Sequence, residues 1–413
     1  MYFTKSLPLV ICGVLAHIVA AQSLEVVPAR AMIDEPVAIR ATGLTPGERI
    51  TIRAELTDGS GEPWASHAEF KADPQGTVDT SKQAPVAGSY KKISAVGLIW
   101  SMMPQKKGVS GYMSPPNFGP QTVDFHLLRQ GKDAAAARLE QRALAEGVQH
   151  TPVSENGLRG VWFVPAGTGR HAAVLVVGGS NGGLPLRPAA WLASHGYFAL
   201  ALAYFHFEDL PKELENIPLE YFQKALEWMV GRPEIGDAKI AVLGTSRGGE
   251  LALQLGSMFP RINAVVAYVP ANTRGPSCCG QIATPAWTWQ GRALSYTRGA
   301  GGGGTIEVES TQGPILMISG QADLVWDSSD MADAVVSRLK NRHFAYSAEN
   351  LKYSDAGHLA GRQEFIPAWH GLVRHPISGR EIYMGGSAEG DAKSSIDSIP
   401  KVLDFLRKNL VGQ

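Results

Sequence analysis

The chain has 413 residues, of which 44% are hydrophobic, so it is long enough for two domains and can bury a large core. Lysine plus arginine and aspartate plus glutamate number 38 each, which gives a formal net charge of zero. This balance removes the electrostatic argument for a nucleic-acid binder, which needs a basic face, although it leaves room for a local patch.

The first residues have the pattern of an export signal. Lys5 precedes the apolar run 7–16, and small residues at 19–21 offer a cleavage site before Gln22. The run is shorter than the roughly 20 residues of a membrane-spanning helix, and no later stretch is long and apolar enough to cross a bilayer. We therefore predict a cleaved signal peptide over residues 1–21, a periplasmic or secreted protein, and no stable membrane span in the mature chain. An intracellular protein is the alternative if the segment is not a working signal.

Two cysteines remain after this cleavage, and they are adjacent. Cys278 and Cys279 form no disulfide framework, and with no histidine nearby they make a poor zinc site. They either join in a vicinal bridge or stay reduced. Since the chain also has no P-loop and no redox motif, we predict neither a metal nor a cofactor.

Short strand patterns follow the predicted signal. Apolar and polar residues alternate from Ile50 to Leu56 and from Val123 to Leu127, and the turn signal 43–47 precedes the first of these runs. This pattern predicts an immunoglobulin-like β-sandwich over residues 22–132. The segment 133–150 is rich in Ala, Leu, Glu and Arg, and we predict a helical or extended linker there.

From residue 151 onward, short apolar runs alternate with helical patterns. Runs such as 174–177 and 197–204 predict buried parallel strands, and 218–230 and 331–339 have the periodicity of amphipathic helices. Strands that alternate with helices favour a parallel sheet covered on both faces. The fold class of the second domain is therefore α/β.

One motif in this domain carries chemistry. Gly244-Thr245-Ser246-Arg247-Gly248 fits Gly-x-Ser-x-Gly, with a strand pattern at 240–243 before it and a helical pattern at 249–257 after it. A strand, a sharp turn and a helix are what the nucleophile elbow of an α/β-hydrolase requires, which predicts that domain over residues 151–413 with Ser246 as nucleophile. The competing interpretation is an ordinary turn whose serine caps a helix.

A serine nucleophile needs a base and an acid, and in this fold they follow it in the order acid, then histidine. Asp323 comes directly after the strand pattern 313–319, and His358 follows a turn of small residues. We predict these two as the partners of Ser246. The alternatives are Asp327 and Asp330, which also suit a helix N-terminus, and the histidines His370 and His375.

Backbone donors must hold the oxygen that becomes negative during acyl transfer. One should be the amide of Arg247, the residue after the nucleophile, and the other should come from the glycine-rich loop 178–183 after an early strand. We predict Gly179 or Ser180 for the second. The loop lacks the Gly-Lys-Ser/Thr ending of a P-loop, so phosphate binding is not predicted there.

These motifs and their neighbours resemble the acyl-CoA thioesterase and bile acid-CoA:amino acid N-acyltransferase (BAAT) family over nearly the whole mature chain. The segments that carry the resemblance are 34–37 (Asp-Glu-Pro-Val), 43–47 and 96–102 for its β-sandwich domain, and 201–211, 219–222 and 244–251 for its hydrolase domain. Segment 274–305, which holds the cysteine pair and a glycine run, has no clear counterpart. Its Trp287, Trp289 and Tyr296 either line an acyl pocket or pack a structural flap, and we favour the flap.

The resemblance implies a catalytic triad of Ser246, Asp323 and His358. Thioesterases of the family carry serine at the nucleophile and its bile-acid acyltransferases carry cysteine, so Ser246 implies hydrolysis of a fatty acyl-CoA to a free acid. The export signal departs from this pattern, because coenzyme A is found inside cells. The alternatives are an exported carboxylesterase on oxygen esters or an acyltransferase. A non-catalytic binding protein is disfavoured because Ser, Asp and His are all present in the expected order.

Overall fold

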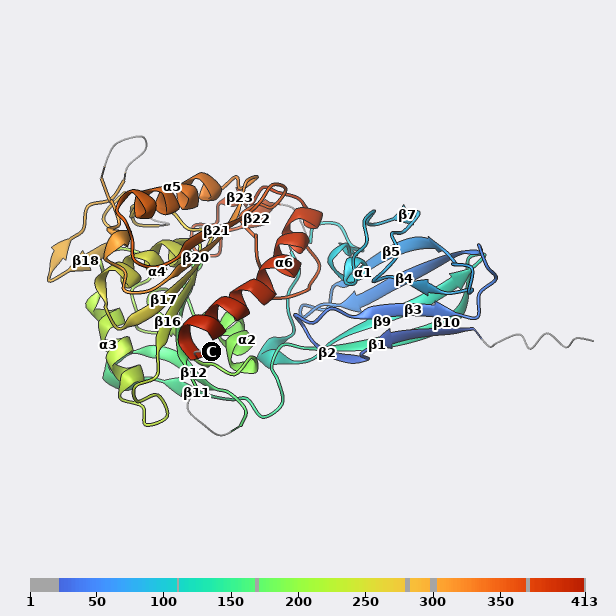
Figure 1. The fold of residues 1–413 in the computed structure, drawn as a ribbon, viewed down its shortest axis with the longest axis horizontal. Helices are drawn as coiled ribbons and strands as arrows, with labels where there is room; N and C mark the ends of the chain where they lie inside the picture. Colours follow the sequence, from blue (N-terminus) through green and yellow to red (C-terminus); the bar gives the residue numbers. More distant parts are fainter. Residues whose placement is uncertain are drawn as a thin grey trace, which may run out of the picture.

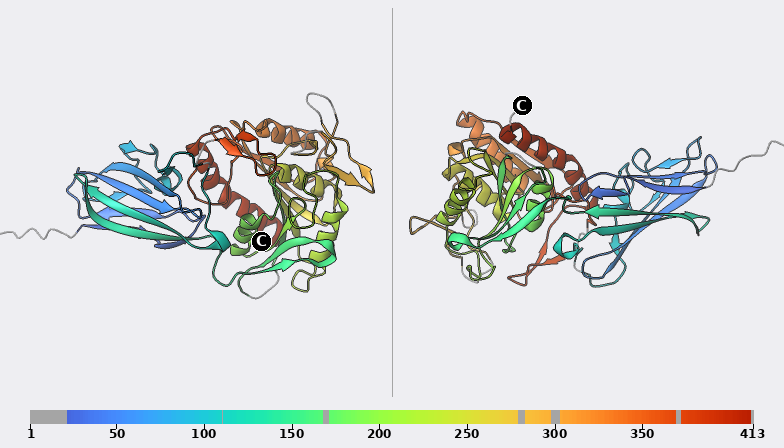
Figure 2. Two further views of the ribbon diagram at one scale, coloured as in Figure 1. Left: turned by 180° about the vertical axis from the view of Figure 1, so that it is seen from behind. Right: turned by 90° about the horizontal axis from the view of Figure 1, so that it is seen from below.

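The computed structural model describes residues 22–109, 111–167, 171–278, 283–297, 303–368 and 372–411. The predicted signal peptide, residues 1–21, lies outside the described residues. The chain forms two lobes placed end to end, an all-β lobe at the N-terminus and a larger α/β lobe (Figure 1 and Figure 2). In the described ranges, no helix has the length and apolar character needed to cross a bilayer.

The N-terminal lobe is a sandwich of two sheets. The first has the order β1-β3-β6 and the second the order β2-β10-β9-β4-β5-β7, with β8 paired to β5. The predicted alternation is confirmed, because Ile50, Ile52, Val123 and Phe125 are all fully or almost fully buried. The elements are β1 (Ser23–Val27), β2 (Arg30–Met32), β3 (Ala38–Thr42), β4 (Arg49–Thr57), β5 (Pro63–Lys71), β6 (Val78–Asp79), β7 (Ala87–Gly88), α1 (Gly97–Trp100), β8 (Met103–Pro104), η1 (Pro116–Phe118), β9 (Gln121–Arg129) and β10 (Lys132–Arg142).

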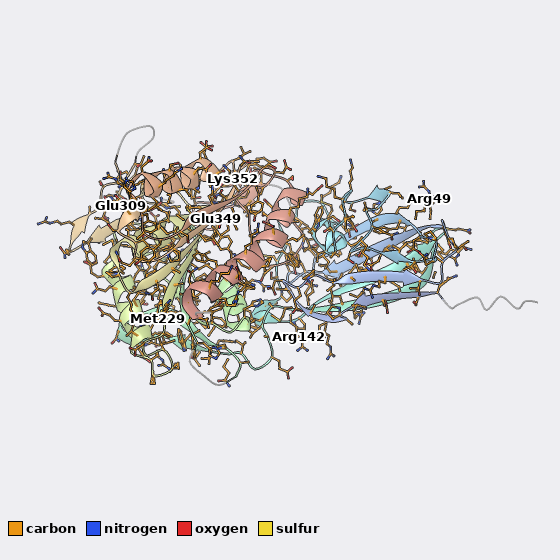
Figure 3. The ribbon with its side chains drawn as sticks, viewed as in Figure 1. Arg49, Arg142, Met229, Glu309, Glu349 and Lys352 are labelled. Atoms are coloured by element: carbon orange, nitrogen blue, oxygen red, sulfur yellow. The ribbon has the colours of Figure 1, made fainter. Side chains whose placement is uncertain are left out.

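The predicted linker over 133–150 is wrong for most of that segment. Strand β10 occupies Lys132–Arg142 and pairs antiparallel with β9, and β11 (Gln149–Val153) already belongs to the second lobe. Its Ala and Glu content suits a helix, but pairing with β9 outweighs this weak preference. The strand signal is the every-second-residue burial that ends at Leu139 and Gln141. Arg142 lies where the sandwich meets the α/β lobe (Figure 3).

The second lobe contains an eight-stranded sheet of order β11-β12-β14-β13-β16-β17-β20-β21. Strand β12 is antiparallel to both of its neighbours, and the pairings from β14 to β21 are parallel. This is the sheet of an α/β-hydrolase, as predicted. The remaining strands of this sheet are β12 (Arg159–Val164), β13 (Ala173–Val177), β14 (Phe198–Ala203), β16 (Ile240–Thr245), β17 (Ile262–Tyr268), β20 (Ile315–Gly320) and β21 (Ala348–Tyr353).

Helices cover both faces of this sheet, and strand residues alternate between the two cores. Val174 and Val176 of β13 pack in the core that contains α2 (Leu186–Ser194) and α6 (Ala388–Leu406), and this core continues into the sandwich. Leu175 and Val177 pack in the core that contains α3 (Glu220–Val230), α4 (Arg247–Met258) and α5 (Ser328–Asn341). The other elements are η2 (Glu155–Gly157), β15 (Ile217–Pro218), β18 (Trp287–Trp289), β19 (Arg292–Ala293), η3 (Val308–Ser310), β22 (Leu372–Arg374), β23 (Glu381–Tyr383) and η4 (Arg407–Val411).

Candidate active site

Ser246 occupies a sharp turn between β16 and α4. Its φ of 60° and ψ of −121° lie in a region that non-glycine residues rarely adopt, which is the strained backbone of a nucleophile elbow. The flanking glycines are sterically required. A Cβ on Gly244 would lie 1.9 Å from the carbonyl oxygen of Gly248, and one on Gly248 would lie 2.4 Å from that of Gly178. The motif therefore forms the predicted turn.

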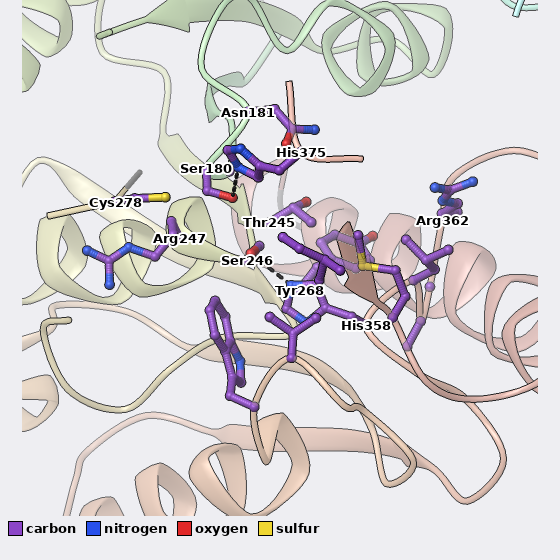
Figure 4. Close-up of a pocket in the computed structure, with 18 of the residues that line it drawn as sticks. Ser180, Asn181, Thr245, Ser246, Arg247, Tyr268, Cys278, His358, Arg362 and His375 are labelled. Carbon is purple, nitrogen blue, oxygen red and sulfur yellow. Dashed lines mark hydrogen bonds between the residues drawn. The ribbon is translucent and has the colours of Figure 1, made fainter. Parts of the chain in front are cut away.

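The structure brings Ser246, His358 and Asp323 into one chain of hydrogen bonds. His358 Nε2 lies 2.8 Å from Ser246 Oγ, and its Nδ1 lies 2.8 Å from Asp323 Oδ2 (Figure 4). The three residues are 9%, 8% and 6% exposed, in the order Ser246, His358, Asp323. Because the carboxylate accepts from Nδ1–H, Nε2 is left to accept the serine proton.

Local backbone contacts aim the acid and the base. Asp323 follows β20, and its Oδ1 accepts the backbone N–H groups of Val325 at 2.9 Å and Trp326 at 3.3 Å. The Trp326 ring meets the His358 ring edge-on, with centroids 4.8 Å apart. The His358 N–H donates to the Met384 carbonyl at 2.8 Å. These contacts fix the orientation of both side chains.

Asp327, Asp330 and His375 have other contacts than Ser246 in the structure. Asp327 is the N-cap residue of α5 and Asp330 lies in its first turn, so both complement the helix dipole. His370 lies outside the described residues. His375 is buried but faces Ser180, with its Nε2 3.1 Å from the serine Oγ.

The predicted oxyanion donors surround Ser246. The Arg247 amide is the first N–H of α4, and it therefore has no acceptor within the helix. A Cβ on Gly179 would lie 3.3 Å from Ser246 Cβ and 3.1 Å from the Thr245 carbonyl, so the loop 178–183 contacts Ser246 at this residue. Ser180, the next residue, lines the same pocket.

Ser246 and His358 open into a pocket with a cavity volume of about 430 Å³. Its described lining includes the guanidinium-bearing Arg362 and Arg380 and contains no carboxylate. Arg362 and Arg380 are both exposed, and the charges of Asp391 and Glu364 also act on Arg362. The sequence carried no local signal for these arginines, since they lie in irregular segments after His358. The apolar part of the lining consists of Tyr268, Val325, Trp326, Leu359, Ala360, Ile382 and Met384.

The segment after residue 273 is fixed to the nucleophile helix by a buried carboxylate. Glu250 Oε2 accepts from Arg247 at 2.6 Å and from the Gly275 N–H at 3.1 Å, and its Oε1 accepts from Trp287 Nε1 at 2.9 Å. Burial raises the pKa of Glu250, and the charge of Arg247 opposes that shift. The Arg247 guanidinium also donates to the Pro276 carbonyl at 2.8 Å. The Arg247 side chain is therefore held by its bonds to Glu250 and to the segment after residue 273.

The aromatic residues of this segment pack as a flap, as favoured. Trp287 is 1% exposed, Trp289 meets Phe259 edge-on, and Tyr296 donates to the Ala283 carbonyl. None of the three lines the pocket. Cys278 does line the pocket and is disulfide-bonded, while Cys279 lies outside the described residues.

The sandwich supports the segment that follows His358. Phe365 N–H donates to the Ile33 carbonyl at 2.8 Å, and Ala368 N–H donates to the Trp100 carbonyl at 2.9 Å. The Gln141 side-chain amide reaches the Phe365 carbonyl at 3.3 Å. Residues 359–363 of this segment line the pocket, so one pocket wall rests on the other lobe.

Across the described part of the chain, no three His, Cys, Asp or Glu side chains are grouped so as to hold a metal ion. The hydrogen-bonded serine, histidine and aspartate form a set suited to acyl transfer.

Comparisons with known proteins agree with this assembly. A family model described as the acyl-CoA thioester hydrolase/BAAT N-terminal region matches residues 34–155, and one described as the BAAT/acyl-CoA thioester hydrolase C-terminal region matches 217–279 and 291–412. The second leaves only 280–290 unmatched between its two parts, so the insert without a counterpart is shorter than the predicted 274–305.

Relatives align over almost their whole length. Acyl-coenzyme A thioesterase 6 from Homo sapiens is 29% identical, over 92% of this chain and 94% of that protein. Acyl-coenzyme A amino acid N-acyltransferase 1 from Mus musculus is 30% identical, over 93% of this chain and 97% of that protein. Among solved structures, an α/β hydrolase enzyme from a deep-sea metagenome library aligns with 53% of this chain and 87% of its own, at 19% identity and a TM-score of 0.38. Since the family models match most of the chain and both domains align, this protein is an enzyme that belongs to the acyl-CoA thioesterase/BAAT family.

Proposed function

We propose that this protein is a serine hydrolase that cleaves acyl thioesters of coenzyme A to a free acid and CoA. The observation that carries the proposal is the Asp323–His358–Ser246 hydrogen-bond chain, whose serine and histidine open into the pocket. The aligned relatives are named as acyl-CoA thioesterases and acyl-CoA amino acid N-acyltransferases, which supports chemistry at an acyl thioester.

In the first half of the reaction, Ser246 Oγ attacks the acyl carbonyl carbon while its proton moves to His358 Nε2. The Asp323 carboxylate stabilises the imidazolium that forms. The carbon–sulfur bond then breaks, and His358 gives the proton to the departing sulfur. The products of this half are an acyl ester on Ser246 and a free thiol.

In the second half, His358 takes a proton from water, and the resulting hydroxide attacks the acyl-serine ester. The carbon–Oγ bond breaks, Oγ recovers the proton from His358, and the carboxylic acid leaves. In both halves the carbonyl oxygen becomes negative between the Arg247 amide and an amide of Gly179 or Ser180, which stabilise that charge.

The charge of the pocket supports a coenzyme A leaving group over a neutral ester. The whole chain has no net charge, yet the described pocket lining has arginines and no carboxylate. A local positive excess raises the concentration of anionic substrates near the site, and coenzyme A carries phosphates where a simple ester carries no charge. Serine at position 246, in place of the cysteine of the bile-acid acyltransferases, supports hydrolysis over transfer to an amino acid.

A substrate panel tests this proposal. The purified protein is given acyl-CoAs and nitrophenyl esters of varied chain length, with and without glycine or taurine, and free thiol and free acid are measured. We expect thiol and acid release from acyl-CoA without an amino acid acceptor. Ser246→Ala should lower kcat by at least about 10⁴-fold, as removal of a catalytic serine does in other hydrolases. Ser347→Ala, at an exposed serine away from the pocket, is the matched control.

Other results of the panel would assign a different function. Turnover of oxygen esters alone would make the protein a carboxylesterase, and formation of acyl-glycine or acyl-taurine would make it an acyltransferase. A fluorophosphonate probe separates these enzymes from a binding protein, because only a reactive Ser246 is labelled.

We also propose that the protein is exported, on the strength of the charged, apolar and small-residue segments of residues 1–21. Sequencing of the N-terminus of the native protein should find Gln22. An intact Met1 would overturn the proposal.

A further inference from the structure

The pocket contains a second buried histidine, His375, which the proposed reaction does not use. It follows β22 and lies opposite the loop 178–183 (Figure 4). Only 4% of its surface is exposed, and its Nε2 lies 3.1 Å from Ser180 Oγ. The contact joins two segments that are 195 residues apart in sequence, and both residues line the pocket.

Backbone contacts decide which nitrogen of this ring carries the proton. The N–H groups of Ile377 and Ser378 donate to His375 Nδ1 at 3.3 Å and 3.2 Å. A ring nitrogen that accepts a hydrogen bond has no proton, so Nε2 carries it and donates to Ser180. Burial lowers the pKa of His375, a hydrogen bond with the Ser180 backbone opposes this shift, and nearby His206 adds to it, so the net change favours the neutral form.

Ser180 is the neighbour of the residue that contacts the nucleophile. Gly179 lies against Ser246 Cβ and the Thr245 carbonyl. The loop has a second attachment on its far side, where Gly183 N–H donates to the Phe205 carbonyl at 3.0 Å. The bond from His375 therefore holds the loop at Ser180, which lies between the contact of Gly179 with Ser246 and the attachment at Gly183. A shift of about 1 Å in such donors is enough to lower a rate by about 100-fold.

We propose that His375 is a positioning residue, whose hydrogen bond to Ser180 holds the loop 178–183 at the distance from Ser246 that oxyanion binding requires. It touches no reacting atom and takes no proton from the substrate. The inference rests on the proposed role of Ser246 as nucleophile.

Three variants test the inference: His375→Phe, His375→Gln and Ser180→Ala. His375→Phe removes the donor and should lower kcat by about 10- to 100-fold, near the loss caused by removal of one oxyanion donor, with KM changed by less than about 3-fold. His375→Gln keeps an N–H donor of similar reach and should recover most of that loss. His67→Phe, at an exposed position of β5, is the control.

A double-variant cycle separates positioning from a general effect on folding. If His375 acts through Ser180, His375→Phe with Ser180→Ala should lose little more than His375→Phe alone, because His375→Phe already removes both the side-chain and the backbone contact with Ser180. The inference would be overturned if the kcat losses of the two single variants multiplied in the double variant. It would also be overturned if the variants changed thermal stability alone, or if His375→Phe had the same kcat as the wild type.

Fluorophosphonate titration keeps this result distinct from failure of the proposed function. Rates are expressed per labelled Ser246 site, so misfolded protein does not count. A wild type that neither labels nor turns over acyl substrates refutes the proposed function. A wild type that does both, with an equally active His375→Phe variant, refutes only the role of His375.

Discussion

Two pocket walls follow His358 in the chain, and they are held in different ways. The first, residues 359–368, lies between the lobes, with Phe365 buried and bonded to the sandwich through Ile33. The second is the β22–β23 hairpin, whose outer side chains face solvent: Leu372 is 53% exposed and Tyr383 is 48% exposed. The hairpin reaches the loop 178–183 through His375.

The contrast shows what the sandwich does for the enzyme. None of the described pocket-lining residues lies between 22 and 142, so the sandwich does not line the pocket within the described residues. It instead fixes the backbone of the segment that begins directly after His358. The sandwich therefore contributes to the site by holding one wall, while the exposed hairpin supplies polar groups, including those of His375 and Arg380.

The largest expected effect comes from breaking the buried wall. Phe365→Ala should lower the free energy of unfolding by about 3–5 kcal/mol, because it removes a large side chain from the core shared by the lobes. Tyr383→Ala, an aromatic truncation on the exposed wall, should change it by less than about 0.5 kcal/mol. Urea denaturation of both variants measures the difference. Equal losses of unfolding free energy in the two variants would mean that the two walls are equally well packed.

A smaller effect is expected where the sandwich meets helix α2. Asp34 Oδ2 accepts from Trp191 Nε1 at 2.9 Å and from His195 Nε2 at 2.7 Å, and Asp34 is buried. Asp34→Ala should cost about 1–3 kcal/mol, because it leaves buried donors without their acceptor. The control is Asp133→Ala, at an exposed side chain of β10. Denaturation midpoints that coincide for the two variants would contradict the prediction.

The smallest effect concerns binding at the exposed wall. Arg380→Ala should raise KM for acyl-CoA about 5- to 10-fold, since one partly exposed charge pair contributes about 1 kcal/mol, and should leave KM for a neutral nitrophenyl ester unchanged. The difference in KM for acyl-CoA between the wild type and Arg380→Ala should become smaller as salt is added, because salt screens the charge of Arg380. Arg374→Ala, on the same hairpin but outside the pocket lining, is the control. An equal rise in KM for both substrates would show that Arg380 supports the structure of the wall and does not recognise the charge of the substrate.

The parts of the site that the sequence predicted are those encoded by short local patterns. The elbow needs small residues at Gly244 and Gly248 whatever surrounds it, and the strand before it is a continuous apolar run. The acid and base follow their strands in an order that the parallel sheet imposes. The structure joins Ser246, Asp323 and His358 by hydrogen bonds, and their catalytic roles stay a prediction.

The parts that were missed depend on contacts between distant segments. The composition of 133–142 suits a helix, and its pairing with β9 and β2 makes it a strand. Arg380 and the β22–β23 hairpin carry no motif, and their place in the pocket follows from how the chain returns after His358. The same holds for Glu250, whose partners Gly275 and Trp287 lie 25 and 37 residues further along.

The Glu250 cluster has a consequence for how this site can evolve. The position after the nucleophile is variable in the Gly-x-Ser-x-Gly motif, but here its side chain is bound to a carboxylate that also holds the flap. Loss of one partner from a buried ion pair costs about 3–5 kcal/mol, whereas joint replacement by apolar residues of similar volume is often neutral. Substitutions at Arg247, Glu250 and Trp287 should therefore show strong epistasis. The identity of Arg247 is constrained by the flap, whereas the oxyanion role proposed for its amide does not depend on the side chain.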